Sequence, residues 1–528
     1  MYAVPECRGS SEARRVAITI ALALAFLPTL SPAQTNLPGL ASIGVTRSFS
    51  WHTGPRFDPR PCPDDLVVPN ALDQTAVSCG SVTVPQDRND PGAKLAHVVI
   101  PVVVYAAASA RNRTPLVFLA GGPGEPAIDV VSQIFLATPA GQVIVRERPV
   151  IAFNQRGFGD DTAATNPTLG ELAYRPRATR VESVRSISDS ARSVAKRLRA
   201  RGIDPRNFTT LRAVDDVRDV VRALGYERVV LFGSSYGTRL ALQFMRKYGD
   251  MVEAAILDGV APPSDTGVFD PERVANARRA VAARVVQDCV GDASCASEYK
   301  DLQSLATEME RPEAPPLHRV INLPKAGGWY SVELNSRDVL SAIGAYAGTE
   351  PARAAIPQLL EEFGRADTLR RAFSPQLVLD VVRETALLRA AGPIYPVIYH
   401  IVLCGDTPAG VPQAGGRAVC EALGVPFDGP DAIATVRSDV PTLLLSSTYD
   451  AQTPPELAEN AARTLSRSHR VLFPGVGHLA YARPISAACV AVIVQSFLLD
   501  PLHDMPDRCA SSLRPSFLPR SADVTTSP

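Results

Sequence analysis

The chain has 528 residues, which is enough for two domains or for one domain with large insertions. Hydrophobic residues make up 46% and charged residues 20%, so a globular protein with a sizeable core is expected. Lys plus Arg and Asp plus Glu balance at 54 each, so the chain lacks the basic excess that nucleic-acid binding requires.

Residues 1–33 have the pattern of a secretory signal peptide. Basic residues precede the apolar run Val16–Leu27, and Ser31-Pro32-Ala33 supplies small residues for cleavage. Because this run is short for a membrane span, we expect a secreted or periplasmic protein without membrane insertion after cleavage. An uncleaved anchor is the alternative. An extended, proline- and glycine-punctuated lead-in is expected over 34–60.

Eight cysteines follow this N-terminal region, and they fall into four pairs that are close in sequence. Such pairs suggest disulfide bonds in an oxidising compartment, although other connectivities are possible. A zinc site is the competing interpretation, but the chain has no C-x-x-C pair and no histidines clustered near these cysteines. We expect the bonds Cys62–Cys79, Cys289–Cys295, Cys404–Cys420 and Cys489–Cys509.

Short apolar strands alternate with helices through 61–260, which predicts the first part of an α/β core with a mostly parallel sheet. Strands are expected at 81–85, 97–105, 115–120, 149–154, 229–232 and 254–257. Helices are expected at 183–201, 214–224 and 238–247.

The pattern changes over 261–434, where helical stretches are separated by Pro/Gly-rich loops. No repeat period is visible, so we expect one helical cap inserted over the sheet, with helices at 271–290, 336–348, 356–373 and 374–391. The second part of the core is expected over 435–510, with strands at 441–447 and 469–473 and helices at 455–465 and 486–499. A flexible, Ser/Pro-rich tail is expected over 511–528.

The candidate nucleophile lies in Gly233-Ser234-Ser235-Tyr236-Gly237, a G-x-S-x-G between a strand and a helix. A serine in that setting lies on a sharp strand-to-helix turn, which presents its hydroxyl above the sheet with a helix N-terminus behind it. We therefore predict that Ser235 is a nucleophile. An ordinary βα turn is the alternative.

A general base and an acid are expected after the nucleophile in the chain. Of the seven histidines, only His478 lies in a glycine-containing loop after a strand, and Asp450 lies at the end of the preceding strand. Asp258 also ends a strand, but a turn-capping role suits it better. The expected chemistry is attack on a carbonyl by Ser235, proton transfer through His478, and orientation of the imidazole by Asp450.

The oxyanion of the tetrahedral intermediate needs two backbone N–H donors. One is expected from Tyr236, the residue after the nucleophile, and the other from Gly122 in the loop Gly121-Gly122-Pro123-Gly124. A phosphate-binding loop is the alternative for these glycines. It is disfavoured because no lysine follows and the P-loop pattern is absent.

Together these motifs resemble the prolyl iminopeptidase / tripeptidyl aminopeptidase family of serine α/β-hydrolases, over most of the chain from Cys62 to Cys509. The similar segments are Gly121–Gly124, Asn154–Gly159, Gly233–Gly237, Leu257–Gly259, Asp450 and Gly477-His478. The cysteine-bearing cap segment and the C-terminal region resemble the secreted tripeptidyl aminopeptidases. The resemblance implies the α/β-hydrolase fold and an exopeptidase that removes residues or short peptides from free N-termini under a helical cap.

Two positions depart from the family pattern: Ala120 replaces a histidine and Asn154 replaces an aspartate. Neither belongs to the expected triad, so they bear on substrate preference. An aminopeptidase also needs a carboxylate for the substrate ammonium group, and the candidates are Asp406 in the cap and Glu125 beside the glycine loop. For both, a solvated or capping carboxylate is the alternative.

The leading hypothesis is a secreted serine aminopeptidase that acts on peptides, with no metal or organic cofactor. The alternatives are a carboxylic-ester hydrolase on the same scaffold and a catalytically silent binding protein. The triad by itself does not distinguish an ester from an amide. The complete set of Ser235, Asp450 and His478 argues against a silent protein.

Overall fold

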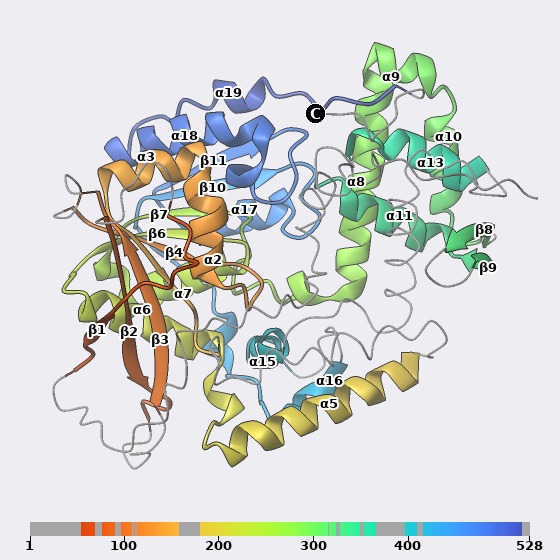
Figure 1. Cartoon of the computed structure of the whole chain (residues 1–528). Helices are drawn as coiled ribbons and strands as arrows, with labels where there is room; N and C mark the ends of the chain where they lie inside the picture. Colours follow the sequence, from red (N-terminus) through yellow and green to blue (C-terminus); the bar gives the residue numbers. More distant parts are fainter. Residues whose placement is uncertain are drawn as a thin grey trace, which may run out of the picture.

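The computed structural model describes residues 54–68, 76–89, 97–107, 110, 113–157, 180–314, 316–323, 328–348, 353–365, 397–408 and 416–519 (Figure 1). The expected signal peptide at 1–33 and the expected helix at 374–391 lie outside these residues, so both stay predictions.

Within the described residues, a nine-stranded sheet forms the centre of the core, in the order β1-β2-β3-β5-β4-β6-β7-β10-β11. Neighbouring strands from β5 to β11 are parallel, whereas β1, β2 and β3 join the other edge antiparallel. This confirms the expected mostly parallel sheet. The strands are β1 (Phe57–Arg60), β2 (Val77–Pro85), β3 (His97–Tyr105), β4 (Leu116–Leu119), β5 (Val150–Phe153), β6 (Val229–Ser234), β7 (Val252–Asp258), β10 (Thr442–Ser447) and β11 (Ser468–Phe473).

Helices cover both faces of the sheet because successive strand residues point to opposite sides. Phe118 of β4 packs into a core layer under α3 and α18, and its neighbour Val117 packs into the layer under α6, α7 and α17. The covering helices are α3 (Pro139–Glu147), α6 (Thr210–Ala223), α7 (Tyr236–Tyr248), α17 (Pro455–Ala462) and α18 (Pro484–Leu499). Both layers are apolar, which explains why the strands read as short continuous apolar runs.

Among the described residues, no single helix is both long and apolar enough to span a membrane. The bent pair Ala127–Ala137 and Pro139–Glu147 would be long and apolar enough together, by length and composition only.

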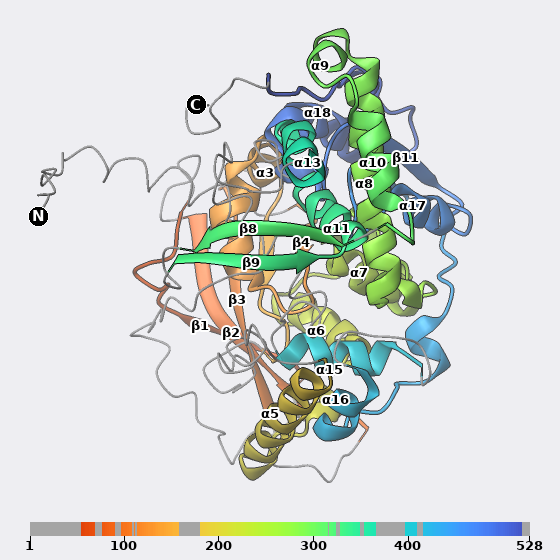
Figure 2. The same cartoon turned by 90° about the vertical axis from the view of Figure 1, so that its right-hand side faces the viewer.

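The cap consists of two groups of elements beside the core (Figure 2). The larger group has its own apolar core and contains α8 (Pro271–Gly291), α9 (Ala293–Glu298), α10 (Leu302–Glu310), α11 (Ser336–Tyr346) and α13 (Ile356–Arg365). An antiparallel hairpin, β8 (Leu317–Leu323) with β9 (Gly328–Leu334), extends from it. This hairpin was not expected in a cap in which helices were predicted to dominate.

The smaller group packs around a separate apolar cluster. Its helices are α5 (Arg180–Ala200), α15 (Val397–Asp406) and α16 (Gly416–Leu423). The helix α5 falls inside the segment that we assigned to the first part of the core. The structure instead packs its C-terminal half against α15 and α16, so the cap region is assembled from two distant parts of the chain.

All four expected disulfides are present. Cys289–Cys295 joins α8 to α9, and Cys404–Cys420 joins α15 to α16, so each group of the cap holds one disulfide. Cys62–Cys79 and Cys489–Cys509 fasten segments at the two ends of the described core. Such bonds are typical of proteins in oxidising compartments.

The expectation of a flexible tail at 511–528 needs correction for its first part. Phe517 and Leu518 pack against the apolar core of the larger cap group, and Leu518 N–H donates to the Ala354 carbonyl at 3.0 Å. The Ser/Pro-rich composition of the tail gave no sign that these two apolar side chains are packed against the cap. The chain from 511 to 519 therefore runs from the core to the cap, and 520–528 lies outside the described residues.

A buried ion-pair cluster ties the N-terminal strands to the central helices. Arg156, from the Asn154–Gly159 motif, donates from Nε and Nη2 to the two carboxylate oxygens of Asp216 at 2.6 Å each. Arg88 also donates to Asp216 at 2.6 Å. The Arg156 and Asp216 side chains are each 1% exposed, so water cannot replace either partner.

Asp216→Asn is expected to lower the free energy of unfolding by about 3–5 kcal/mol, because it leaves the Arg156 guanidinium buried without a counter-charge. Urea unfolding of the purified protein measures the change. The matched control is Asp189→Asn, which breaks the exposed ion pair with Arg192 and should cost less than about 1 kcal/mol. Equal losses of unfolding free energy in the two variants would contradict the expectation that the buried ion pair matters more than the exposed one.

Candidate active site

The turn between β6 and α7 holds Ser235 in a strained conformation. Its φ is 55° and its ψ is −122°, a region that residues other than glycine rarely adopt. The Ser235 N–H donates to the Asp258 carbonyl at 2.9 Å, which anchors the turn on the neighbouring strand β7. The helix α7 begins at the next residue, so Ser235 lies at the positive end of its dipole.

The glycines of the motif are needed for close packing. A Cβ placed on Gly237 would lie 1.8 Å from the Leu119 carbonyl oxygen, and one on Gly233 would lie 2.8 Å from the Gly237 carbonyl oxygen. Any side chain at either position would push the helix off the sheet. The turn expected from the G-x-S-x-G pattern is therefore the turn that the structure contains.

Asp450 and His478 lie together where β10 and β11 end. His478 Nδ1 lies 2.7 Å from Asp450 Oδ2. Burial by itself would raise the pKa of Asp450, but His478, Thr453 and backbone N–H groups hold the pKa below its ordinary value. Because an ionised carboxylate only accepts hydrogen bonds, Nδ1 carries the ring proton and Nε2 is left to accept one.

Thr453 completes this pair, and sequence reasoning missed it. Its Oγ1 donates to Asp450 Oδ2 at 2.6 Å and lies 3.1 Å from His478 Nδ1. Its backbone N–H donates to the other Asp450 oxygen, Oδ1, at 2.8 Å. The spacing Asp-x-x-Thr after a strand was the available signal, since a threonine three residues on can bond an aspartate side chain in a tight turn.

Asp258, the rival acid, has a different partner. Its two carboxylate oxygens accept the backbone N–H groups of Ala480 at 3.1 Å and Tyr481 at 2.9 Å. Burial raises the pKa of Asp258 to about 6, against the opposing effect of these two donors. Asp258 thus accepts hydrogen bonds from the segment after His478 with its side chain and from the Ser235 N–H with its backbone carbonyl.

This buried carboxyl group makes stability depend on pH. The unfolded pKa is near 3.9 and the folded pKa near 6, so between these values the folded protein binds more protons than the unfolded chain. The stabilisation from Asp258 is complete below about pH 4 and is lost as the pH rises through 6, by about 3 kcal/mol. Urea unfolding at pH 4.5 and 7.5 should show about 2 kcal/mol of this loss in the parent protein relative to Asp258→Asn, since the first part of the loss occurs below pH 4.5. Parallel pH dependences would contradict it.

The loop after β4 places Gly122 at the same end of the sheet. Gly122 is exposed and has a φ of 101°, a conformation that favours glycine. Tyr236 is the first residue of α7, so its N–H has no acceptor within the helix. The two residues present the N–H groups that we expected to bind an oxyanion, and that role stays a prediction.

The two expected ammonium-binding carboxylates differ in their surroundings. Asp406 is fully buried, and its Oδ2 accepts from Arg239 Nε at 2.7 Å and from Thr210 Oγ1 at 2.8 Å. Thr210 Oγ1 in turn lies 2.8 Å from the hydroxyl of Tyr236. Asp406 is therefore already paired with an arginine, and Thr210 connects it by hydrogen bonds to Tyr236, the first residue of α7. Glu125 is exposed beside the glycine loop.

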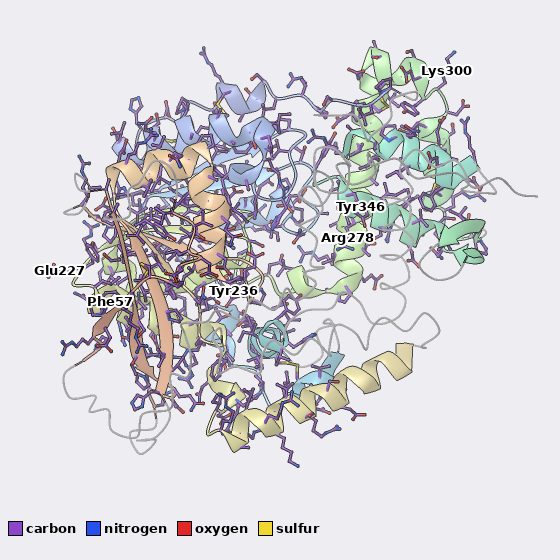
Figure 3. The ribbon with its side chains drawn as sticks, viewed as in Figure 1. Phe57, Glu227, Tyr236, Arg278, Lys300 and Tyr346 are labelled. Atoms are coloured by element: carbon purple, nitrogen blue, oxygen red, sulfur yellow. A yellow bond between two sulfur atoms is a disulfide. The ribbon has the colours of Figure 1, made fainter. Side chains whose placement is uncertain are left out.

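Cap residues reach the histidine loop. Arg353 Nη1 donates to the Gly475 carbonyl, and a Cβ placed on Gly477 would lie 2.2 Å from Gly348 Cα. Figure 3 shows Tyr236 on the side of the core nearest the cap, with Arg278 and Tyr346 on the cap helices beyond. In the described part of the chain, no group of three or more His, Cys, Asp or Glu side chains is placed to hold a metal ion.

Comparisons with known proteins give a family and several relatives. Residues 114–482 match the family model described as alpha/beta hydrolase fold. Serine protease Hip1 of Mycobacterium tuberculosis is 24% identical over 460 residues, which cover 80% of this chain and 85% of the relative. Tripeptidyl aminopeptidase of Streptomyces coelicolor is 25% identical over 195 residues, and these cover 36% of each chain.

Two solved structures are among the matches by shape. Proline iminopeptidase of Mycobacterium smegmatis matches with a TM-score of 0.35 and 17% identity, over 79% of this chain and 99% of that chain. An esterase from Rhodococcus sp. ECU1013 matches with a TM-score of 0.35 and 14% identity, over 76% of this chain and 95% of that chain.

Proposed function

The chain belongs to the alpha/beta hydrolase fold family, and on that premise we propose that it is a secreted serine aminopeptidase acting on free peptide N-termini. The chain is a serine hydrolase. Its action on peptides, the requirement for a free amine, and secretion or periplasmic export through residues 1–33 are the proposed parts. Four disulfides support an oxidising compartment.

One observation carries the proposed chemistry: a buried aspartate lies 2.7 Å from Nδ1 of a histidine in a fold that also presents a strained serine. In the proposed mechanism, Ser235 Oγ attacks the scissile carbonyl carbon while its proton passes to His478 Nε2. Asp450 stabilises the resulting imidazolium at Nδ1. The N–H groups of Gly122 and Tyr236 donate to the oxyanion.

Collapse of the tetrahedral intermediate then releases the leaving amine, which takes the proton from His478 Nε2. A water molecule then attacks the acyl-enzyme ester while His478 Nε2 accepts its proton. As the bond between the acyl carbon and Ser235 Oγ breaks, His478 returns the proton to Oγ and the acid product leaves. The choice of peptides over other acyl compounds draws on the names of the relatives, a serine protease and a tripeptidyl aminopeptidase.

The test is a substrate comparison with the purified mature protein. Amino-acyl and tripeptidyl anilides, their N-acetylated counterparts and short acyl esters are assayed side by side. Hydrolysis of the free-amine anilides, with a large loss on N-acetylation, is the expected result. Activity on esters alone, or peptide hydrolysis indifferent to N-acetylation, would reject the aminopeptidase in favour of another serine hydrolase.

A further inference from the structure

Glu125 is a carboxylate beside the nucleophile that the triad does not use. It directly follows the glycine loop, and its Oε2 accepts a hydrogen bond from the Gly121 N–H at 3.1 Å. A Cβ placed on Gly121 would lie 2.9 Å from this oxygen and 3.1 Å from Ser235 Cβ. Two atoms this near to one point are at most about 6 Å apart, so the carboxylate lies next to the reacting centre.

Glu125 is exposed at the surface of the loop and yet partly desolvated by the protein around it. This desolvation raises the pKa of its carboxyl group, against the opposing effect of His478. Its Oε2 nevertheless faces inward at Gly121, close to the nucleophile turn. Among the described residues, Glu125 forms no ion pair with a lysine or arginine, whereas Asp406 is paired with Arg239.

We propose that Glu125 binds the α-ammonium group of the substrate and thereby sets the cleavage at one residue from the N-terminus. This inference rests on the proposed aminopeptidase function and deepens it, since it names the group that recognises the amine and the length of the fragment released.

The position of the carboxylate argues for release of single residues. In any peptide the N-terminal nitrogen lies about 2.5 Å from the carbonyl carbon of its own residue. In an extended tripeptide the nitrogen lies about 9 Å from the third carbonyl carbon, because each residue adds about 3.5 Å. The attacked carbon must approach Ser235 Oγ to about 3–3.5 Å. A carboxylate at most about 6 Å from Ser235 Cβ reaches the amine of the residue whose own carbonyl is attacked from many directions, but it reaches the amine of an extended tripeptide only when that chain runs straight from the serine toward Glu125.

Charge argues in the same direction. An ionised carboxylate that is poorly solvated and lacks a cationic partner is unfavourable. A substrate ammonium group supplies the missing partner and gains short, charge-assisted hydrogen bonds. An N-acetylated substrate supplies neither, so Glu125 discriminates against blocked N-termini.

Glu125→Gln tests the proposal, because the amide oxygen can still accept from the Gly121 N–H while the charge is lost. We expect kcat/KM for a free-amine amino-acyl anilide to fall by about 10- to 100-fold, mainly through KM. Hydrolysis of an acyl ester without an amine should change by less than about 2-fold. Glu125→Asp keeps the charge and should restore part of the loss. Glu227→Gln is the matched control, since Glu227 lies at the edge of the core far from Tyr236 (Figure 3).

The length of the fragment is tested with trialanyl anilide. Sequential release of single alanines should produce free alanine first and the anilide chromophore after a lag. Immediate chromophore release with free trialanine would overturn the single-residue inference while leaving the aminopeptidase intact. Equal losses by Glu125→Gln on the anilide and the amine-free ester would also overturn it, since they would assign Glu125 to loop structure. The proposed function would fail in a different measurement: the parent protein would hydrolyse free-amine and N-acetylated peptide anilides equally well.

Discussion

Ser235→Ala is expected to lower kcat by about 10⁵-fold or more for every substrate of the protein. In the proposed mechanism, the substitution removes the atom that forms the acyl bond, and the oxyanion donors that remain cannot supply a nucleophile. Alanine keeps the Cβ and therefore the packing of the turn, which already accommodates a residue with a φ of 55°. Thermal melting should change little, so a loss of activity would report on chemistry.

Steady-state assays and a melting curve on the same preparation measure both effects. Ser294→Ala is the matched control, because Ser294 is exposed on α9 at the far end of the cap. Its activity should equal that of the parent protein. Turnover by Ser235→Ala at more than about 1% of the parental rate would show that the nucleophile lies elsewhere.

Asp450→Asn should lower kcat by about 10⁴-fold. The Asp450 carboxylate accepts from His478 Nδ1 at 2.7 Å and fixes the tautomer in which Nε2 can take a proton. An amide offers an N–H₂ group as well as an oxygen, so it favours the tautomer in which Nε2 is protonated and cannot act as a base. It also leaves the imidazolium that forms during attack without a counter-charge.

Asp258→Asn is the comparison, since Asp258 is a second buried carboxylate in contact with the histidine loop. Its removal should alter stability and lower kcat by less than about 10-fold, because Asp258 binds backbone N–H groups and not the imidazole. Measurement of kcat for both variants decides the assignment. A larger loss in Asp258→Asn than in Asp450→Asn would exchange their roles.

Local sequence was sufficient for several features, and the reasons are physical. Gly233 and Gly237 flank a serine between an apolar run and a helix-forming segment, and only a tight strand-to-helix turn uses all three. The four disulfides could be paired because each joins cysteines no more than 20 residues apart. Alternating strands and helices predicted the parallel sheet because a parallel crossover requires a long connection.

Contacts between distant segments were decided by the tertiary structure. In the sequence, Asp406 and Glu125 were both plausible as carboxylates that bind an ammonium group. Folding places Arg239, which is 167 residues away, against Asp406, and it places Glu125 beside Ser235. The contact of Leu518 with Ala354 and the packing of α5 on α16 also join distant segments. The spacing of apolar residues within each segment does not show which other segment it contacts. The sequence alone thus predicted the turn that holds Ser235, the contact between Asp450 and His478, and the four disulfides. Which of the two carboxylates is paired with an arginine depended on the fold, because the partner of a charge is a neighbour in space and not in sequence.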